Sequence, residues 1–353
     1  MADFAIVRAH AHATSRTPGG VERWEADLVR ALAGRVDALA DGEAPRHRYR
    51  VVHAETAYGK RLAREMRAKL VQTFHGAAWL MARHGYQTGR RGIYRVGQTG
   101  VYAMLTLDYA RTLARVDAAV CVSRKVRDHL RAQTVAHKRK VVLIENGVDV
   151  ERFHPPAQPE RGERALFYGR LEPNKGLPQL LDAVGPDVPL DVAGGGSLAP
   201  LVERVARERP NVRFLGALGQ EDLVAAIGRA RLVCTPSLNE TFGLVGIEAL
   251  ACGTPAVLTR EFDVHGETGR LLSRCEPTPA SIREAIRAAW DLKTPAWSRA
   301  AREAVCREYD FRGRARAYLA LYEHLAAGGA PRDFAHPEAA APDAQPAGRG
   351  RKP

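Results

Sequence analysis

Two glutamates, Glu240 and Glu248, flank the start of a predicted helix. An apolar run over 230–236 is typical of a buried strand that ends at a proline, and the helical pattern that follows stops at Gly253-Thr-Pro255. N–H groups at the start of a helix lack partners within it and attract anions, while a pair of carboxylates suits a polyhydroxylated ligand. The candidate N–H donors are those of Thr241, Phe242, Gly243 and Leu244. The pattern predicts a site for a sugar attached to a phosphate, although an ordinary strand–loop–helix unit with two incidental glutamates has the same spacing.

A glycine-flanked loop adds two positive charges. The segment Gly169–Gly176 directly follows a predicted strand over 165–168, and it carries Arg170 and Lys175. Ligands bind at the carboxyl ends of the strands in open α/β sheets, and a guanidinium with an ammonium suits a diphosphate. Each of the two could also be a plain surface charge. The run Ala193–Ser197 could let a backbone approach a phosphate, but it lacks the glycine spacing of a dinucleotide site, which disfavours a nicotinamide dehydrogenase.

The first half of the chain offers two further candidates at strand ends. His75 follows the predicted strand 70–74, and Gly20 follows the first strand, 4–7. A histidine at the carboxyl edge of a sheet would face a cleft between domains, and a glycine there permits close approach of the backbone. A lone histidine is more often structural, so neither residue identifies a reaction by itself.

Short apolar runs that alternate with amphipathic segments predict an α/β fold with parallel sheets. The 353 residues are enough for two domains with sizeable cores. The predicted division is a Rossmann-like domain over 1–157, a second over 158–310, a helix over 311–327 that returns to the first, and a disordered tail over 328–353.

Composition limits the function classes. No stretch approaches the roughly 20 apolar residues that a membrane-spanning helix needs. The five cysteines are scattered, which predicts a reduced, cytoplasmic compartment. Residues 1–157 carry 27 Lys and Arg against 15 Asp and Glu, which is 12 of the net charge of +13. This half should therefore attract a membrane surface, a phosphorylated acceptor or nucleic acid, unless it is simply a well-solvated arginine-rich surface. The segment 60–70 predicts a helix whose basic face carries Lys60, Arg64 and Arg67.

Taken in order, the motifs resemble those of retaining glycosyltransferases of the GT-B fold, the large family 4 group. The segments that carry the resemblance are Gly19-Gly20 with Glu22, His75-Gly76, Val122-Ser123, Asn146–Asp149 with Phe153, Gly169–Gly176 and Pro236–Pro255. The resemblance covers most of residues 1–327. It implies an α/β GT-B architecture, in which two Rossmann-like domains face each other and the second holds most of a nucleotide-sugar donor.

The resemblance also implies roles for single residues. Arg170 and Lys175 would neutralise the departing diphosphate, and Glu248 would bind the ribose hydroxyls. Glu240 and the N–H groups of Phe242, Gly243 and Leu244 would hold the transferred sugar and the β-phosphate. Gly20 would approach the phosphates from the first domain, and His75 would contact the sugar near the reacting carbon. The family is described by front-face attack assisted by the diphosphate, with no metal and no cofactor.

The implied function is transfer of a hexose or N-acetylhexosamine, from a UDP-sugar or next from GDP-mannose, to a cell-envelope glycan or glycolipid. Anionic membrane is a candidate partner, so the protein would be cytoplasmic or peripheral on the inner face of the membrane. Alternatives are a small natural-product acceptor, a non-catalytic sugar-nucleotide protein, or a nucleic-acid binder, which no recognised module supports. One departure stands out: the family's Gly-Gly-x-x-Glu segment is missing, and Thr259–His265 runs directly into Gly266–Gly269.

Overall fold

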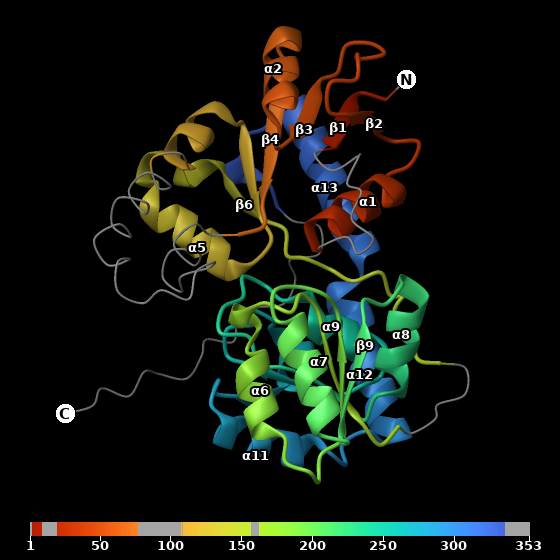
Figure 1. Cartoon of the computed structure of the whole chain (residues 1–353). Helices are drawn as coiled ribbons and strands as arrows, with labels where there is room; N and C mark the ends of the chain where they lie inside the picture. Colours follow the sequence, from red (N-terminus) through yellow and green to blue (C-terminus); the bar gives the residue numbers. More distant parts are fainter. Residues whose placement is uncertain (1, 9–19, 77–106, 108, 157–161, 336–353) are drawn as a thin grey trace, which may run out of the picture.

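In a computed structural model, the chain forms two α/β domains, one above the other, joined by a hinge (Figure 1). The structure describes residues 2–8, 20–76, 107, 109–156 and 162–335. Each domain is built on a six-stranded sheet in which all paired strands are parallel. The α/β class and the pair of Rossmann-like domains predicted from the sequence are confirmed.

The first sheet has the order β2-β1-β3-β4-β5-β6. The chain adds β2 on one side of β1 and then β3 on the other side, and this reversal of the strand order is typical of Rossmann-like sheets. Its strands are β1 Phe4–Arg8, β2 Asp37–Ala40, β3 Val51–Ala54, β4 Lys69–Phe74, β5 Ala118–Cys121 and β6 Val141–Leu143. The described residues of this half include the helices α1 Gly20–Ala31, α2 Ala57–Met66 and α5 Arg124–Gln133, and the 3-10 helix η1 Val135–Lys140. Apolar residues of α2 and α5 form one core against the sheet, and α1 contributes to another.

The second sheet has the order β12-β11-β10-β7-β8-β9. Its strands are β7 Ala165–Tyr168, β8 Leu190–Ala193, β9 Val212–Gly216, β10 Leu232–Thr235, β11 Ala256–Thr259 and β12 Ser273–Cys275. Its helices are η2 Pro173–Lys175, α6 Leu177–Ala183, α7 Ala199–Glu208, α8 Gln220–Arg229, α9 Leu244–Ala251, α10 Gly266–Arg270, α11 Pro279–Ala289 and α12 Pro295–Tyr309. One core contains residues of α8, α9 and α12, and the other contains residues of α6, α7 and α11.

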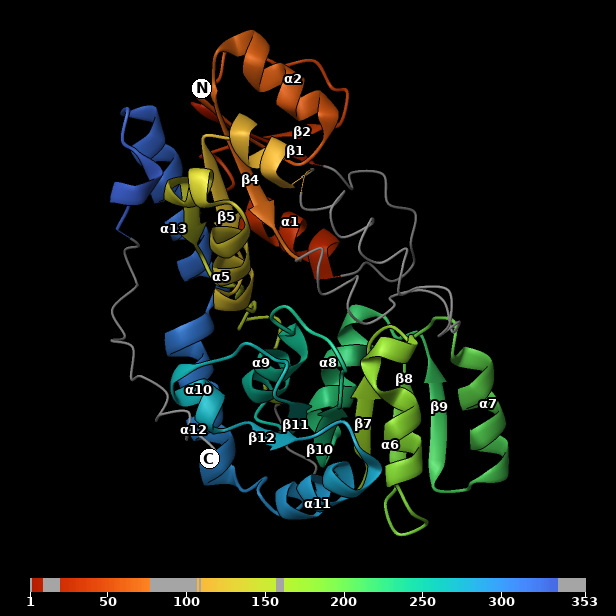
Figure 2. The ribbon, with the colours of Figure 1, turned by 90° about the vertical axis from the view of Figure 1, so that its left-hand side faces the viewer.

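A long helix, α13 (Phe311–Ala326), returns from the second domain to the first, as predicted (Figure 2). Its buried Tyr318, Leu321 and Tyr322 share a core with Phe4 and Trp24. The returning helix follows α12 directly, and Val148 and Asp310 form an isolated parallel bridge where the two connections between the domains pass each other.

Buried polar groups also tie α13 to the first sheet. The Nδ1 atom of His53 lies 2.5 Å from the hydroxyl of Tyr322, and its Nε2 atom lies 3.0 Å from the hydroxyl of Thr73. The Thr73 hydroxyl is also 3.2 Å from that of Tyr318. Burial lowers the pKa of His53 from 6.5 to about 4. His53 is therefore neutral at physiological pH, where both ring nitrogens can take part in this network.

Two expectations from the sequence are corrected. The helix predicted over 60–70 ends at Met66, because Arg67 adopts a left-handed conformation (φ 55°) and Lys69 already belongs to β4. The tail predicted to be disordered from Gly328 begins with an ordered turn, η3 (Pro331–Asp333). His324 holds that turn, since its Nε2 atom lies 2.9 Å from the Ala330 carbonyl oxygen. Residues 336–353 of the predicted tail lie outside the described part of the chain.

The buried His53 should make stability depend on pH. The unfolded chain binds a proton at this histidine below about pH 6.5, whereas the folded protein resists protonation down to about pH 4. From this group alone, the free energy of unfolding should therefore fall by up to ~1.4 kcal/mol for each unit by which the pH is lowered between these two values. His53→Gln should remove this part of the slope in urea unfolding measured from pH 7 to pH 4. Identical slopes for the variant and the wild type would contradict the assignment.

Candidate active site

The segment between β10 and α9 carries Glu240 at the carboxyl edge of the second sheet, as predicted. Helix α9 begins at Leu244, and its N-cap residue Gly243 has a φ of 85° and offers no side-chain cap. A side chain at Gly243 would overlap Phe262, since a Cβ atom there would lie 2.1 Å from the Phe262 ring. Gly243 has no side chain with which to cap the first turn, and N–H groups at the start of a helix favour an anionic ligand. The side chain of Phe242 is buried in the core, so this residue can offer only its backbone.

Glu240 and Lys175 contact each other directly. The Lys175 ammonium donates to the Oε1 atom of Glu240, and the Ser237 hydroxyl donates to the same oxygen at 3.2 Å. Gly176 permits this approach, because a Cβ atom there would lie 2.0 Å from the Pro236 carbonyl oxygen. The loop after β7 and the loop after β10 thus pack backbone to backbone. This packing brings the predicted phosphate-binding cation to the predicted sugar-binding carboxylate.

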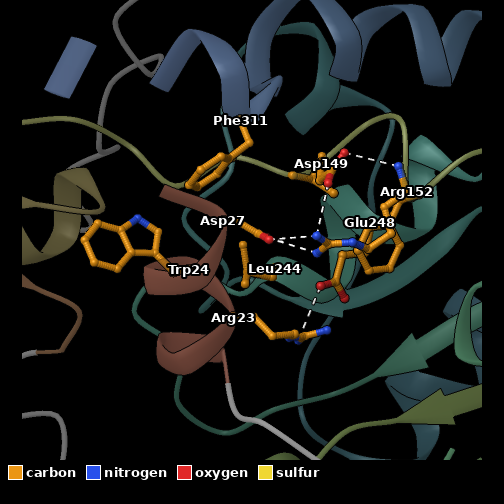
Figure 3. Close-up of a pocket in the computed structure, with 11 residues that line it drawn as sticks. Arg23, Trp24, Asp27, Asp149, Arg152, Leu244, Glu248 and Phe311 are labelled. Carbon is orange, nitrogen blue, oxygen red and sulfur yellow. Dashed lines mark hydrogen bonds and ion pairs between the residues drawn. The ribbon is translucent and has the colours of Figure 1, made fainter. Parts of the chain in front are cut away.

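Glu248 lies inside α9, and only 2% of its surface is exposed. Its Oε2 atom accepts a hydrogen bond of 2.9 Å from the Tyr168 hydroxyl. Its Oε1 atom lies 3.4 Å from a guanidinium nitrogen of Arg23 (Figure 3). Burial, followed by the charge of Glu248, raises the pKa of Tyr168 well above its usual value, so the tyrosine stays a hydrogen-bond donor. The Nε atom of Arg23 is buried and has no hydrogen-bond partner among the described residues.

Further ion pairs join α1 to Asp149 and Arg152, which lie in the connection between β6 and β7, next to Glu248. Arg152 donates two hydrogen bonds to the carboxylate of Asp27, at 3.0 and 2.7 Å, and lies 3.1 Å from Asp149 (Figure 3). Burial alone would lower the pKa of Arg152, but these carboxylates outweigh it and raise the pKa. Arg23, Asp27, Arg152 and Glu248 line a small cavity of about 20 Å³. The cavity lies between the two domains.

The first domain contributes His75 at the end of β4. Its carbonyl oxygen accepts a hydrogen bond of 2.9 Å from the Thr241 hydroxyl, which joins the two domains at the predicted site. The imidazole packs edge-on against Trp24, with ring centroids 4.5 Å apart, and its Nε2 atom lies 3.4 Å from Glu55. Gly20 is the first residue of α1, whose fourth residue is Arg23. The structure thus places His75 directly beside the Glu240 loop and Gly20 on the helix that reaches Glu248.

Arg170 and the glycine run lie differently from Lys175. Arg170 is exposed, and it contributes to lowering the pKa of Glu172, after the hydrogen bond that Ser197 donates. Two glycines of the run serve packing between loops: a Cβ atom at Gly194 would lie 1.9 Å from the Gly169 carbonyl oxygen, and one at Gly196 would lie 2.7 Å from the Leu171 carbonyl oxygen. Loop packing is therefore an alternative explanation for the glycines that were predicted to let the backbone approach a phosphate.

Sequence reasoning missed Arg23, Tyr168, Lys125 and Arg152, all of which surround the predicted residues. Tyr168 is the last residue of β7, a position at the carboxyl edge of the sheet that could have been singled out. Arg23 lies three residues after Gly20, but its contact with Glu248 spans 225 positions of the chain and has no local signal. Among the described residues, no group of three or more His, Cys, Asp or Glu side chains could hold a metal ion. None of the described helices is long and apolar enough to cross a membrane.

The chain matches two models of protein families. Residues 36–152 match the model described as Glycosyltransferase Family 4, and residues 150–295 match Glycosyl transferases group 1. Phosphatidyl-myo-inositol mannosyltransferase of Mycobacterium tuberculosis is 33% identical over 222 residues, which are 57% of this chain and 58% of that protein. Glycogen synthase of the same species is 30% identical over 58% of this chain and 54% of that protein. The chain thus spans somewhat more than half the length of these relatives.

Solved structures share the fold. Sucrose-phosphate synthase from Thermosynechococcus elongatus superposes with a TM-score of 0.74 at 21% identity, over 93% of this chain and 100% of that one. Anabaena HepE, solved in complex with UDP-glucose, superposes with a TM-score of 0.68 at 17% identity, over 92% of this chain and 99% of that one. At these identities the likeness establishes the GT-B arrangement of the two domains.

The Asp27–Arg152 pair should stabilise the protein more than an exposed pair does. The side chains of Asp27 and Arg152 are only 14% and 17% exposed, whereas those of Glu323 and Arg35 are 51% and 60% exposed at a contact of 2.8 Å. Asp27→Ala leaves Arg152 without its two best acceptors and should lower the free energy of unfolding by ~2 kcal/mol, between the values typical of exposed and buried pairs. Glu323→Ala, the control, should cost less than ~1 kcal/mol. Urea unfolding measures both, and equal losses would contradict the difference in burial.

Proposed function

Because the chain belongs to the family 4, group 1 glycosyltransferases, we propose that it transfers a sugar from a nucleotide-diphospho-sugar to an acceptor hydroxyl with retention of configuration. The contact between Lys175 and Glu240 at the start of α9 carries this proposal. It combines a cation for a phosphate, a carboxylate for sugar hydroxyls and the unsatisfied N–H groups of a helix. The proposed sugar is a hexose or N-acetylhexosamine.

Each chemical group of the donor is assigned to residues of the site described above. The ribose hydroxyls fit Glu248, whose remaining hydrogen-bonding capacity lies next to Arg23 in the cavity. The diphosphate fits Lys175, the N–H groups of the first turn of α9, and Arg170 at the rim. Gly20, at the start of α1, is the proposed contact from the first domain, and His75 is the proposed contact near the reacting carbon. UDP-sugars are the leading donors, since HepE is solved with UDP-glucose, and the mannosyltransferase relatives make GDP-mannose the next candidate.

The chemistry proposed for this site is electrostatic. Negative charge develops on the departing diphosphate as the glycosidic bond breaks, and preorganised donors at that position can contribute ~3 kcal/mol or more each. Glu240 shares its Oε1 atom with Lys175 and Ser237, an arrangement that weakens a carboxylate as a nucleophile. Glu240 is therefore assigned to hold the sugar, and the diphosphate oxygen to accept the proton of the acceptor hydroxyl in front-face attack. No step needs a metal.

The acceptor is assigned from charge. Twelve of the thirteen net positive charges lie in residues 1–157, and Arg61, Arg64 and Arg67 are exposed on and after α2. This charge favours a lipid-linked or phosphorylated glycan of the cell envelope and a peripheral position on an anionic membrane. The relatives that act on phosphatidyl-myo-inositol, by their names, have a lipid acceptor of this kind. A small soluble acceptor is the alternative.

The donor site predicts which substitutions stop the reaction. Glu240→Ala and Lys175→Ala should each lower the turnover number by ~100-fold or more, as loss of one preorganised group does in comparable sites. Release of nucleoside diphosphate from a panel of UDP-, GDP- and ADP-sugars measures this, with thermal unfolding to show that both variants fold. Glu208→Ala, an exposed residue at the end of α7, is the control. Near-normal turnover in both site variants would contradict the mechanism, and nucleic-acid binding without any response to sugar nucleotides would favour the non-catalytic alternative.

Membrane docking has its own test. Neutralising Lys60, Arg64 and Arg67 to Gln should weaken binding to vesicles that contain anionic lipid, by at most about 1 kcal/mol per charge, and added salt should weaken wild-type binding too. Neutral vesicles should bind neither protein. The control is the double variant Arg204→Gln/Arg207→Gln on α7, in the second domain. Binding that is insensitive to salt, or lost equally in the control, would rule out docking through α2.

A further inference from the structure

The loop between β11 and α10, residues 260–265, reaches the first domain. Its Asp263 accepts a hydrogen bond of 2.8 Å from the backbone N–H of Lys125, in the first turn of α5, where Ser123 is the N-cap. Burial alone would raise the pKa of Asp263, but hydrogen bonds from His265, the Lys125 N–H and Ser123 outweigh it and lower the pKa. A carboxylate at a helix N-terminus is stabilised by the unsatisfied N–H groups and the helix dipole. The segment that lacks the family's glycine pair therefore serves as a cap for a helix of the other domain.

The side chain of Lys125 continues this contact toward the candidate active site. Its ammonium contacts the Glu261 carboxylate and donates to the Glu240 carbonyl oxygen at 3.1 Å and the Glu261 carbonyl oxygen at 3.4 Å. An ammonium has three N–H groups, and here each has an acceptor on the second domain. Only 24% of the lysine side chain is exposed. A cation of the first domain thus binds the backbone of the residue proposed to hold the sugar.

The same loop supports the segment 240–243 from the other side. The N–H of Asp263 donates to the Phe242 carbonyl oxygen at 3.1 Å, and the Phe262 ring packs against Gly243. Thr241 donates to the His75 carbonyl oxygen of the first domain. Three successive residues, from Glu240 to Phe242, are therefore each held by a hydrogen bond from outside their own segment, two of which cross between the domains.

We propose that Lys125 is a positioning residue that sets the backbone of Glu240 when the two domains are closed on each other. This inference rests on the proposed function, in which Glu240 holds the transferred sugar. Lys125 bonds to the carbonyl oxygen of Glu240 and not to its carboxylate, so it acts through Glu240 without touching the donor. Separation of the domains would break the bonds of Lys125 to Glu240, Glu261 and Asp263 together. Glu240 would then reach its working position only in the closed arrangement, which excludes water from the reacting carbon.

Lys125→Met tests this role, because it removes the ammonium and keeps most of the aliphatic chain. It should lower the turnover number for release of nucleoside diphosphate from UDP-glucose or GDP-mannose, whichever the wild type uses, by about tenfold or more, since a 1 Å displacement can cost ~100-fold. Affinity for UDP or GDP without the sugar, measured by thermal shift, should stay within about twofold of the wild-type value, because Lys125 is proposed not to touch the donor. Loss of a direct contact worth ~1.4 kcal/mol would instead change the affinity tenfold. Lys125→Arg, which can still pair with Glu261, should recover part of the turnover. In a double-mutant cycle, Glu261→Gln should cost less in the Lys125→Met protein than in the wild type.

Arg127→Met is the matched control. It removes the same charge from the same helix, but Arg127 pairs with Asp128 beside it, and no ion pair of Arg127 crosses to the second domain among the described residues. The inference would be overturned if the turnover number of Lys125→Met lay within about twofold of the Arg127→Met value, since the expected loss is about tenfold or more. Loss of the reaction in Glu240→Ala would show that the proposed function itself still holds. Nucleotide affinity lost in proportion to turnover would overturn it too, by placing Lys125 in the donor site. No release of nucleoside diphosphate by the wild type from any sugar nucleotide would overturn the proposed function, and this inference with it.

Discussion

Charges of alternating sign on one face of α1 match charges on the other side of the cleft, and the closed arrangement of the domains depends on this match. Arg23, Asp27 and Arg30 are spaced four and three residues apart, which puts them on the same face of the helix. Their partners are Glu248 for Arg23, Arg152 for Asp27 and Asp149 for Arg30. A helix displaced by one turn would bring like charges together. The pairing therefore fixes both the distance and the register of α1 against Glu248 of the second domain and against Asp149 and Arg152 in the connection that leads to it.

Both carboxylates assigned to the donor are paired with cations. Glu248 is paired with Arg23 and Glu240 with Lys175, so each carboxylate assigned to the donor already has a cation beside it. A buried carboxylate without a partner would be costly, and these pairs remove that cost before the donor arrives. Ribose and sugar hydroxyls carry no charge and can share the carboxylates with the cations. In the proposed donor complex the diphosphate would compete with Glu240 for Lys175, which would link phosphate binding and sugar binding through one lysine.

Local patterns were sufficient to predict the parts of the site that lie within one strand–loop–helix unit. The strand before Glu240, the helix that contains Glu248 and the loop that carries Lys175 follow from hydrophobic periodicity and from glycine and proline positions, and the structure has all three. The end of α2 was mispredicted because helical spacing continues through Arg67, where the backbone turns left-handed to enter β4. The contacts of Arg23, Arg152 and Lys125 were not predictable, because each joins segments more than 100 residues apart or belongs to the packing of two domains. A charge pattern on one helix says nothing about which residues face it.

The shortened loop after β11 departs from the family pattern, and its contacts with the first domain explain what the loop does here. Loss of the glycine pair would by itself remove a close backbone approach at the wall of the site. In its place the chain has Glu261, Phe262 and Asp263, which contact Lys125, Gly243 and the first turn of α5. Glu240 is consequently restrained twice, at its carbonyl oxygen by Lys125 and at its carboxylate by Lys175 and Ser237. A nucleophile in a double displacement must advance on the sugar carbon and then withdraw, and restraint at both ends opposes that movement. The same restraint would suit a group that orients the sugar while the diphosphate departs, so under the proposed function the loop that breaks the family pattern agrees with front-face attack.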